Sequence, residues 1–178
     1  MPSHRTRREI FRLALGAGTL LACPAVATAA SGRRALAMHN LHTAESANTV
    51  YWADGRYVRD GLLELNHLLR DHRANEACDM DPRVLDQLYL LHERCRAREP
   101  FHIISGYRSP STNAMLRSKS DGVAKKSLHM QGQAIDVRLP GVDTDHLREV
   151  ALSMKAGGVG YYAKSDFVHV DTGRVRFW

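Results

Sequence analysis

The sequence predicts a one-domain α+β fold, with a small, mainly antiparallel sheet and helices packed on one face of it. The chain has 178 residues, of which 44% are hydrophobic, enough to form one core. Strand-like stretches lie in residues 33–53 and again near the C-terminus, and segments with apolar residues at helical spacing lie between them. Short turns join several of the expected strands, as is typical of antiparallel pairing.

The first expected elements are two strands, at residues 33–41 and 48–53, with a turn at 42–45 between them. Asp54-Gly55 follows the second strand and is a hairpin-type turn signal.

Two helices should follow, one over residues 59–71 and one beginning at Pro82 with Asp81 as its cap. Both have apolar residues at helical spacing, which are Leu62, Leu65 and Leu69 in the first and Val84, Leu88, Leu91 and Cys95 in the second. Neither helix carries obvious chemistry, so both are interpreted as core.

The second half of the chain should alternate between strands and helices. The expected strands are 101–104, 134–139, 159–163 and 167–172, with a turn at 164–166 between the last two. Ser109 caps and Pro110 begins a short helix, which a polar loop at 118–126 follows. A last helix runs from about 144 to 156, and Gly157-Gly158 should end it.

Residues 1–29 have the pattern of an export signal, which leaves 30–178 as the mature domain. A basic front precedes an apolar run at 13–22 and a small-x-small cleavage site at 27–29. The run is shorter than the roughly 20 residues that a membrane-spanning helix needs. Arg7-Arg8 resembles a twin-arginine signal, with general secretion as the alternative. Export to the periplasm or cell-wall space is expected, with lipid anchoring at Cys23 as an alternative to release of the mature domain.

The charge of the mature domain is only mildly positive. The full chain carries a formal charge of +6, and without its leader it has 21 basic and 18 acidic residues. This balance suits an anionic polymer or an ordinary surface. No Arg-rich stripe with stacked aromatics is present, so no nucleic-acid partner is expected. Nothing in the sequence indicates an oligomer, and a monomer is the default.

Cys78 and Cys95 should be unpaired although export would allow a disulfide. Cys95 lies 13 residues beyond Pro82, about 20 Å along the expected helix. The four residues from Cys78 to Pro82 can return roughly 13 Å at full stretch. Neither cysteine has a CxxC partner, which argues against a cysteine-ligated metal site.

Two histidines and one aspartate stand in a pattern that suits a metal ion. His129 and Asp136 are separated by Gly132, which allows a tight turn, and His169 lies near the C-terminus. In strand 134–139, Asp136 lies on the face opposite Ile135 and Val137.

The same alternation in strand 167–172 puts His169 opposite Val168 and Val170. If the two strands pair with their apolar faces on the core, Asp136 and His169 share one wall. Two imidazoles and one carboxylate, with a fourth position open, are the ligand set of a catalytic zinc site. Spacing alone leaves an alternative open, in which these histidines are ordinary hydrogen-bonded polar residues. With the family resemblance described next, one zinc ion per chain is predicted, in a cleft on the face opposite the helices.

These residues resemble a known family. The pattern Ser127-x-His129-x-x-Gly132-x-Ala134-x-Asp136 with a C-terminal His169 is similar to the zinc peptidases of bacterial cell walls, the D-Ala-D-Ala carboxypeptidase/VanX-type enzymes of metallopeptidase family fifteen. The resemblance is closest to the murein endopeptidases of the MepK (YcbK-like) group. Its further segments are 40–43, 105–109, 158–162 and 167–173. It implies a hedgehog/DD-peptidase-like fold.

The resemblance also implies roles for individual residues. A carboxylate must take a proton from the attacking water, and the family places a glutamate three residues before the last histidine ligand. Here that position is Asp166, the first candidate for the base, and Asp171 is the second, with orientation of an imidazole as its alternative role. Arg108 matches an arginine that stabilises an oxyanion or holds a substrate carboxylate. Ser127 matches a substrate-binding serine, and Tyr107 is a candidate cleft wall.

The expected function is hydrolysis of peptide cross-links in peptidoglycan. The alternatives are a carboxypeptidase or dipeptidase that trims stem peptides, and a zinc-containing wall-binding module without catalysis. The sequence does not decide between a D,D and an L,D bond.

Overall fold

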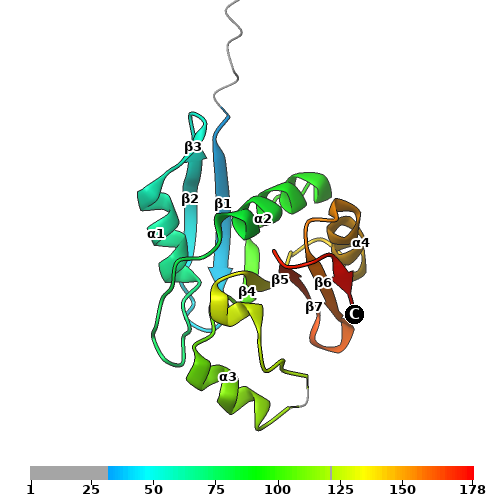
Figure 1. The fold of residues 1–178 in the computed structure, drawn as a ribbon. Helices are drawn as coiled ribbons and strands as arrows, with labels where there is room; N and C mark the ends of the chain where they lie inside the picture. Colours follow the sequence, from blue (N-terminus) through cyan, green and yellow to red (C-terminus); the bar gives the residue numbers. More distant parts are fainter. Residues whose placement is uncertain (1–31, 121) are drawn as a thin grey trace, which may run out of the picture.

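The computed structural model describes residues 32–120 and 122–178 (Figure 1). The predicted export signal and Cys23 lie outside the described residues. The chain forms one sheet of eight strands, in the order β3-β2-β1-β4-β5-β7-β6-β8. The strands are β1 Arg34–Asn40, β2 Ser46–Ala53, β3 Arg56–Tyr57, β4 Phe101–Ser105, β5 Ala134–Arg138, β6 Gly158–Tyr162, β7 Phe167–Asp171 and β8 Arg176–Phe177.

The predicted α+β class is confirmed, and the sheet is largely antiparallel. It is mixed, because β1 pairs parallel with β4 and β6 pairs parallel with β8. The sheet is also larger than predicted. The short strands β3 and β8, which show no periodicity in the sequence, extend it at its two edges.

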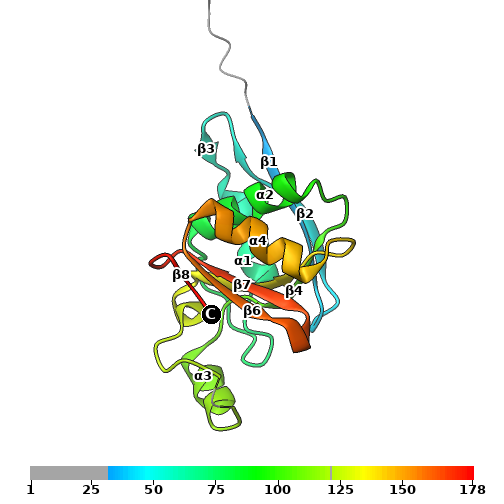
Figure 2. The same cartoon turned by 90° about the vertical axis from the view of Figure 1, so that its right-hand side faces the viewer.

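Three helices build the core together with one face of the sheet. They are α1 Arg59–Leu68, α2 Pro82–Cys95 and α4 Thr144–Met154. Each buries apolar side chains, such as Leu65, Leu88 and Leu147, in one cluster with strand residues of β1, β2, β4, β5, β6 and β7. Figure 2 shows α2 and α4 lying beside each other, and they are in contact. The fourth helix, α3 Pro110–Arg117, stands away from this layer (Figure 1).

The predicted helix starts are confirmed in α2 and α3. The Asp81 side chain accepts a hydrogen bond from the Arg83 backbone N–H, and the Ser109 side chain accepts one from the Thr112 N–H. The predicted end of α4 is wrong. The helix ends at Met154, because Lys155 takes the left-handed conformation at φ 51°.

Gly157 serves close packing rather than capping. A Cβ atom at this position would lie only 1.7 Å from the carbonyl oxygen of Asp171, so only glycine lets the start of β6 approach β7 this closely.

Cys78 and Cys95 are free, as predicted. Within residues 32–120 and 122–178, no helix combines the length and the apolar character that crossing a membrane requires.

Candidate metal centre and active site

Two neighbouring strands carry two of the three predicted ligands. Asp136 of β5 pairs directly with His169 of β7 in the antiparallel register. The residues on either side of each ligand, among them Ile135 and Val168, are buried in the core. The predicted alternation is therefore confirmed, and Asp136 and His169 both lie on the face away from the core.

The third ligand arrives on a short 3-10 helix, Leu128–Gln131, that precedes β5. Gly132 ends this helix with φ 65°, which confirms the tight turn predicted there. A Cβ atom at Gly132 would lie 2.7 Å from the carbonyl oxygen of Asp79, so the turn also needs glycine for space. The turn places the His129 ring beside Asp136 and His169.

The three side chains form a compact buried cluster. His169 Nδ1 lies 2.7 Å from Asp136 Oδ1, and His129 Nε2 lies 3.3 Å from the same oxygen and 3.2 Å from His169 Nδ1. One potential ligand atom from each residue lies within 4.8 Å of the others, and all three residues are buried. Three donor atoms converging on one point fit a transition-metal ion such as zinc.

Hydrogen bonds behind the cluster set the orientation of both imidazoles. His129 Nδ1 donates to the Gly106 carbonyl at 2.7 Å, and His169 Nε2 donates to Asp171 Oδ2 at 3.0 Å. Because each ring carries a proton on its outer nitrogen, His129 Nε2 and His169 Nδ1 can face the metal position as acceptors. This tautomer pattern, inferred from the two outer hydrogen bonds, also fits a metal ion.

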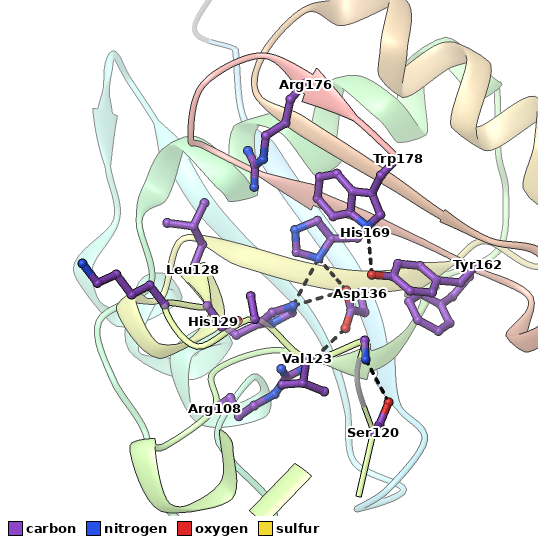
Figure 3. Close-up of a pocket in the computed structure, with 15 residues that line it drawn as sticks. Arg108, Ser120, Val123, Leu128, His129, Asp136, Tyr162, His169, Arg176 and Trp178 are labelled. Atoms are coloured by element: carbon purple, nitrogen blue, oxygen red, sulfur yellow. Dashed lines mark hydrogen bonds and ion pairs between the residues drawn. The ribbon is translucent and has the colours of Figure 1, made fainter. Parts of the chain in front are cut away.

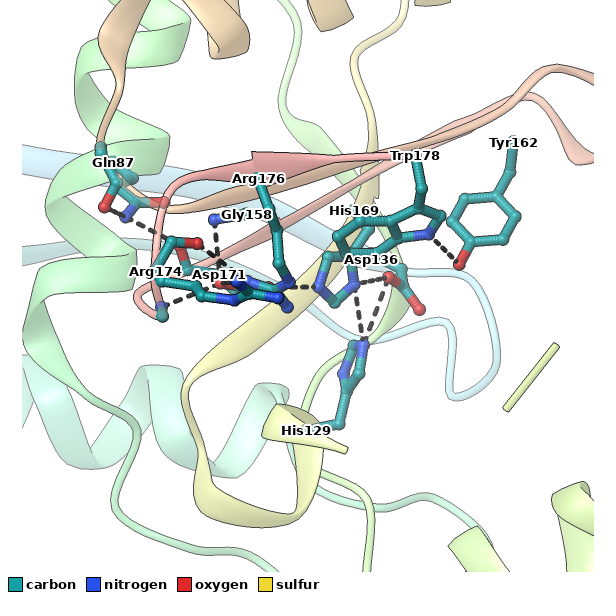
Figure 4. A network of polar contacts seen from close by, with 12 residues as sticks. Gln87, His129, Asp136, Gly158, Tyr162, His169, Asp171, Arg174, Arg176 and Trp178 are labelled. Atoms are coloured by element: carbon teal, nitrogen blue, oxygen red, sulfur yellow. Dashed lines mark hydrogen bonds and ion pairs between the residues drawn. The ribbon is translucent and has the colours of Figure 1, made fainter. Parts of the chain in front are cut away.

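Asp171 lies behind His169 and has no exposed surface (Figure 4). Its carboxylate accepts hydrogen bonds from both terminal nitrogens of Arg176, at 3.0 and 2.7 Å, and from the backbone N–H groups of Gly158 and Gly173. Burial alone would raise the pKa of Asp171, but the hydrogen bonds from His169 and Arg176 hold it below its usual range. The geometry supports the role of orienting an imidazole and does not support Asp171 as a base.

The charges within the cluster favour a cation at its centre. Burial alone would raise the pKa of Asp136, but the neighbouring imidazoles hold it well below its usual range. When no metal ion is bound, His169 donates hydrogen bonds to Asp136 from Nδ1 and to Asp171 from Nε2, and these bonds outweigh its burial and raise its pKa to about 9. The site is therefore built to hold positive charge between two carboxylates.

A pocket of about 320 Å³ opens over the cluster (Figure 3). Arg108 and Ser127, two of the predicted substrate-binding residues, line it. Arg108 Nη2 lies 3.7 Å from Asp136 Oδ2, and only 12% of its side chain is exposed. The Arg108 segment is held in place because the Tyr107 N–H donates to the Leu69 carbonyl at 2.7 Å.

Two predicted site residues are not brought to the pocket. Tyr107 is packed against the core and is not part of the pocket wall. Asp166 is also absent from the wall, and its carboxylate contacts Arg138 at 2.8 Å and the Thr144 hydroxyl. Its side chain is 55% exposed. The geometry therefore does not support Asp166 as a base acting in the pocket.

The sequence analysis missed several residues of the pocket wall. They are Lys126, Tyr162, Phe167, Arg176 and Trp178. Tyr162 and Phe167 lie in two of the segments that carry the family resemblance, 158–162 and 167–173, which was their one signal in the sequence. Arg176 and Trp178 belong to the C-terminal residues 172–178, where no alternation of apolar and polar residues indicates which side chains face the pocket.

Comparison with known proteins decides the family. A family model described as peptidoglycan L,D-endopeptidase MepK matches residues 28–178. The chain belongs to this family. Two similar MepK relatives are the peptidoglycan L,D-endopeptidase of Escherichia coli K12 and the probable one of Haemophilus influenzae. The Escherichia coli protein is 49% identical to this chain, over 97% of this chain and 96% of the relative. The Haemophilus influenzae protein is 41% identical, over 82% of this chain and 78% of the relative. No solved structure shows a significant match to the chain.

Proposed function

We propose that this protein is a zinc-dependent peptidase that hydrolyses peptide cross-links in peptidoglycan, acting on an L,D bond. The observation that carries the proposal is the buried cluster of His129, Asp136 and His169 at the floor of an open pocket. The family of MepK endopeptidases and the names of two relatives supply the substrate and the bond type.

The metal cleft lies on the face of the sheet opposite the helices. His129 Nε2, Asp136 Oδ1 and His169 Nδ1 would hold one zinc ion there. When bound, zinc polarises a carbonyl group and lowers the pKa of a coordinated water. Overall, hydrolysis breaks the amide C–N bond, adds the OH of water to the carbonyl carbon and leaves its proton on the nitrogen.

The remaining pocket residues bind and orient the peptide. The Arg108 guanidinium lines the pocket beside Asp136, and its terminal nitrogens donate to Asn113 and Ser105. Its remaining N–H groups suit a carbonyl oxygen that gains charge or a substrate carboxylate. Ser127 lines the same pocket, and its hydroxyl caps no helix, which leaves it to hydrogen-bond the substrate. Asp171 acts through His169 by fixing its tautomer.

The same proposal includes the route of the protein to its substrate. Residues 1–29 are the export signal, of the twin-arginine type, and residues 30–178 form the peptidase domain in the periplasm or cell-wall space. A twin-arginine route exports folded proteins, which suits a protein that binds its metal before export. The domain acts as a monomer.

A digest of purified sacculi tests the proposal. Residues 30–178 are compared as zinc-loaded, chelator-stripped and His169→Ala samples, and the released muropeptides are weighed by mass spectrometry. Loss of cross-linked dimers with matching gain of monomers, in the zinc-loaded sample alone, supports an endopeptidase, and the masses identify the bond.

Two other outcomes of this digest would contradict the proposal. Shortened stem peptides with intact cross-links would indicate a carboxypeptidase or dipeptidase. Unchanged muropeptides with one zinc bound per chain would indicate a wall-binding module without catalysis.

A further inference from the structure

We propose that Tyr162 is a further catalytic residue, whose hydroxyl donates a hydrogen bond to the substrate oxygen that becomes negative during amide hydrolysis. This inference rests on the proposed peptidase function and deepens it. It starts from the finding that neither Asp166 nor Asp171 faces the pocket, so other groups must act on the substrate there.

The ring of Tyr162 is held in a fixed position. Tyr162 is the last residue of β6 and pairs with Phe167, the first residue of β7. The two rings stack with centroids 4.4 Å apart and planes inclined by 15°. A side chain held by its strand and by a stacked ring keeps its polar end in one place.

The hydrogen-bond pattern aims the Tyr162 hydroxyl hydrogen away from the protein. The indole Nε1–H of Trp178 lies 3.0 Å from the Tyr162 oxygen, and an indole N–H can only donate. The Tyr162 oxygen therefore accepts, and its own hydrogen remains to be donated. Across residues 32–120 and 122–178, no side chain or carbonyl accepts that hydrogen.

Trp178 is 49% exposed, but its backbone is held because its carbonyl accepts a hydrogen bond from the Tyr161 N–H and its N–H donates one to the Val159 carbonyl. Its ring packs on Gly160, where an added Cβ atom would lie 2.7 Å from the indole. The Arg176 guanidinium lies 5.0 Å from the centre of the same ring. The indole also lies 5.2 Å from the His169 ring, so the Trp178–Tyr162 pair stands directly beside the metal cluster.

In both close-up views the hydroxyl end of the Tyr162 side chain points toward Asp136 (Figures 3 and 4). Arg108 approaches the same carboxylate, at 3.7 Å. A peptide carbonyl bound over the cluster would thus meet two donors, the Arg108 guanidinium and the Tyr162 hydroxyl. Fixed donors aimed at a developing negative charge act in the transition state, and removing one of them typically lowers kcat by about 100- to 1,000-fold.

The test is the substitution Tyr162→Phe, which removes the hydroxyl and keeps the stacked ring. Steady-state kinetics are measured on a purified cross-linked muropeptide dimer, with bound zinc counted in the same samples. We expect kcat to fall about 100-fold, KM to change less than about threefold, and zinc to stay at one per chain. Tyr161→Phe is the matched control. Tyr161 packs against the core outside the pocket wall, so its kcat should stay within about twofold of the wild type.

The second variant, Trp178→Phe, keeps an aromatic ring but removes the donor that orients the Tyr162 hydroxyl. It should lower kcat about fivefold, and it should add little once Tyr162 is already phenylalanine, because the two residues act as one unit. It also keeps the inference testable if Tyr162→Phe folds poorly.

Three results would overturn the inference while the wild type is active. They are an unchanged kcat in Tyr162→Phe, a rise in KM alone, and independent, additive effects of the Tyr162 and Trp178 substitutions. An inactive wild type with bound zinc is a different outcome, because it would overturn the proposed peptidase function, and the catalytic role of Tyr162 with it.

Discussion

Replacing Asp171 by asparagine tests whether this buried carboxylate fixes the His169 tautomer. The substitution keeps the shape of the side chain but turns one oxygen into an NH₂ group. If the NH₂ group takes the place of Oδ2, it faces His169 Nε2 and Arg176 Nη2, which are 3.0 and 2.7 Å from that oxygen. If it takes the place of Oδ1, it faces three donors, the N–H groups of Gly158 and Gly173 and Arg176 Nη1.

The first orientation opposes fewer donors and should dominate. His169 then relieves the conflict by moving its proton to Nδ1, the nitrogen that faces Asp136 and His129. A protonated Nδ1 cannot bind a metal. Loss of such an orienting partner typically weakens metal binding by about 10- to 100-fold, or about 1.4 to 2.7 kcal/mol.

The same substitution should also lower the free energy of unfolding. Removing one partner of a fully buried ion pair is destabilising by about 3 to 5 kcal/mol. The Arg176 side chain keeps 30% of its surface exposed and can turn to water. We therefore expect a smaller loss, of about 2 kcal/mol.

The assay is a zinc titration in competition with a chromophoric chelator, together with urea unfolding of the metal-free protein. Asp145→Asn is the matched control, because the Asp145 side chain is 64% exposed and forms a surface ion pair with Arg148, at 3.7 Å. At saturating zinc the Asp171→Asn enzyme should recover kcat to within about tenfold, whereas loss of a general base would leave a deficit of about 100- to 10,000-fold. A folded Asp171→Asn protein that binds zinc as tightly as the wild type would refute the tautomer argument.

Three further predictions follow from the described contacts. Asp166→Ala should keep kcat on muropeptides within about threefold of the wild type, since Asp166 lies outside the pocket wall; a loss above about 100-fold would restore it as the base. Removing zinc with a chelator should lower the free energy of unfolding by about 2.7 kcal/mol, compared with protein in a free zinc concentration 100 times its Kd for zinc. The loss should appear as a lower Tm, and an unchanged Tm would exclude a metal site in the native state. Burial alone would raise the pKa of Asp71, but hydrogen bonds from Thr112 and Ser109 hold it at about 2, against 3.8 when unfolded. Its stabilisation, about 2 kcal/mol, is present above pH 4 and lost as the pH falls through 2, so Asp71→Asn should flatten acid unfolding curves in that window.

The ligand set could be predicted because regular elements carry it. Asp136 and His169 lie in strands whose alternating pattern already assigns each residue to a face, and the observed register places the two opposite each other. Gly132 could be recognised as a turn residue, because a backbone position with a positive φ, here 65°, favours glycine. The start of α2 could be predicted for a similar reason, because the Asp81-Pro82 pair combines a cap with a fixed φ.

The pocket wall could not be predicted because its residues come from segments without periodicity. β8 has only two residues, Arg176–Phe177, and its pairing with β6 depends on a chain reversal at 172–175 that no repeating pattern marks. The ion pair of Arg176 with Asp171 and the contact of Trp178 with Tyr162 both depend on that reversal. Long-range pairing of short irregular segments is decided by packing in the folded protein and not by local sequence.

The position of Asp166 shows why counting residues back from a metal ligand is not enough to find a base. Side chains two residues apart share a face of a strand, so an offset of three from His169 has the opposite parity. Asp166 escapes the core face because it leaves the strand in a left-handed conformation, at φ 51°, which brings it to Arg138. Arg138 stands two residues beyond Asp136 on β5, roughly 7 Å further along the sheet. The carboxylate therefore lies beside Arg138, two strand residues away from Asp136 and outside the pocket wall to which Tyr162 and Arg108 contribute hydrogen-bond donors.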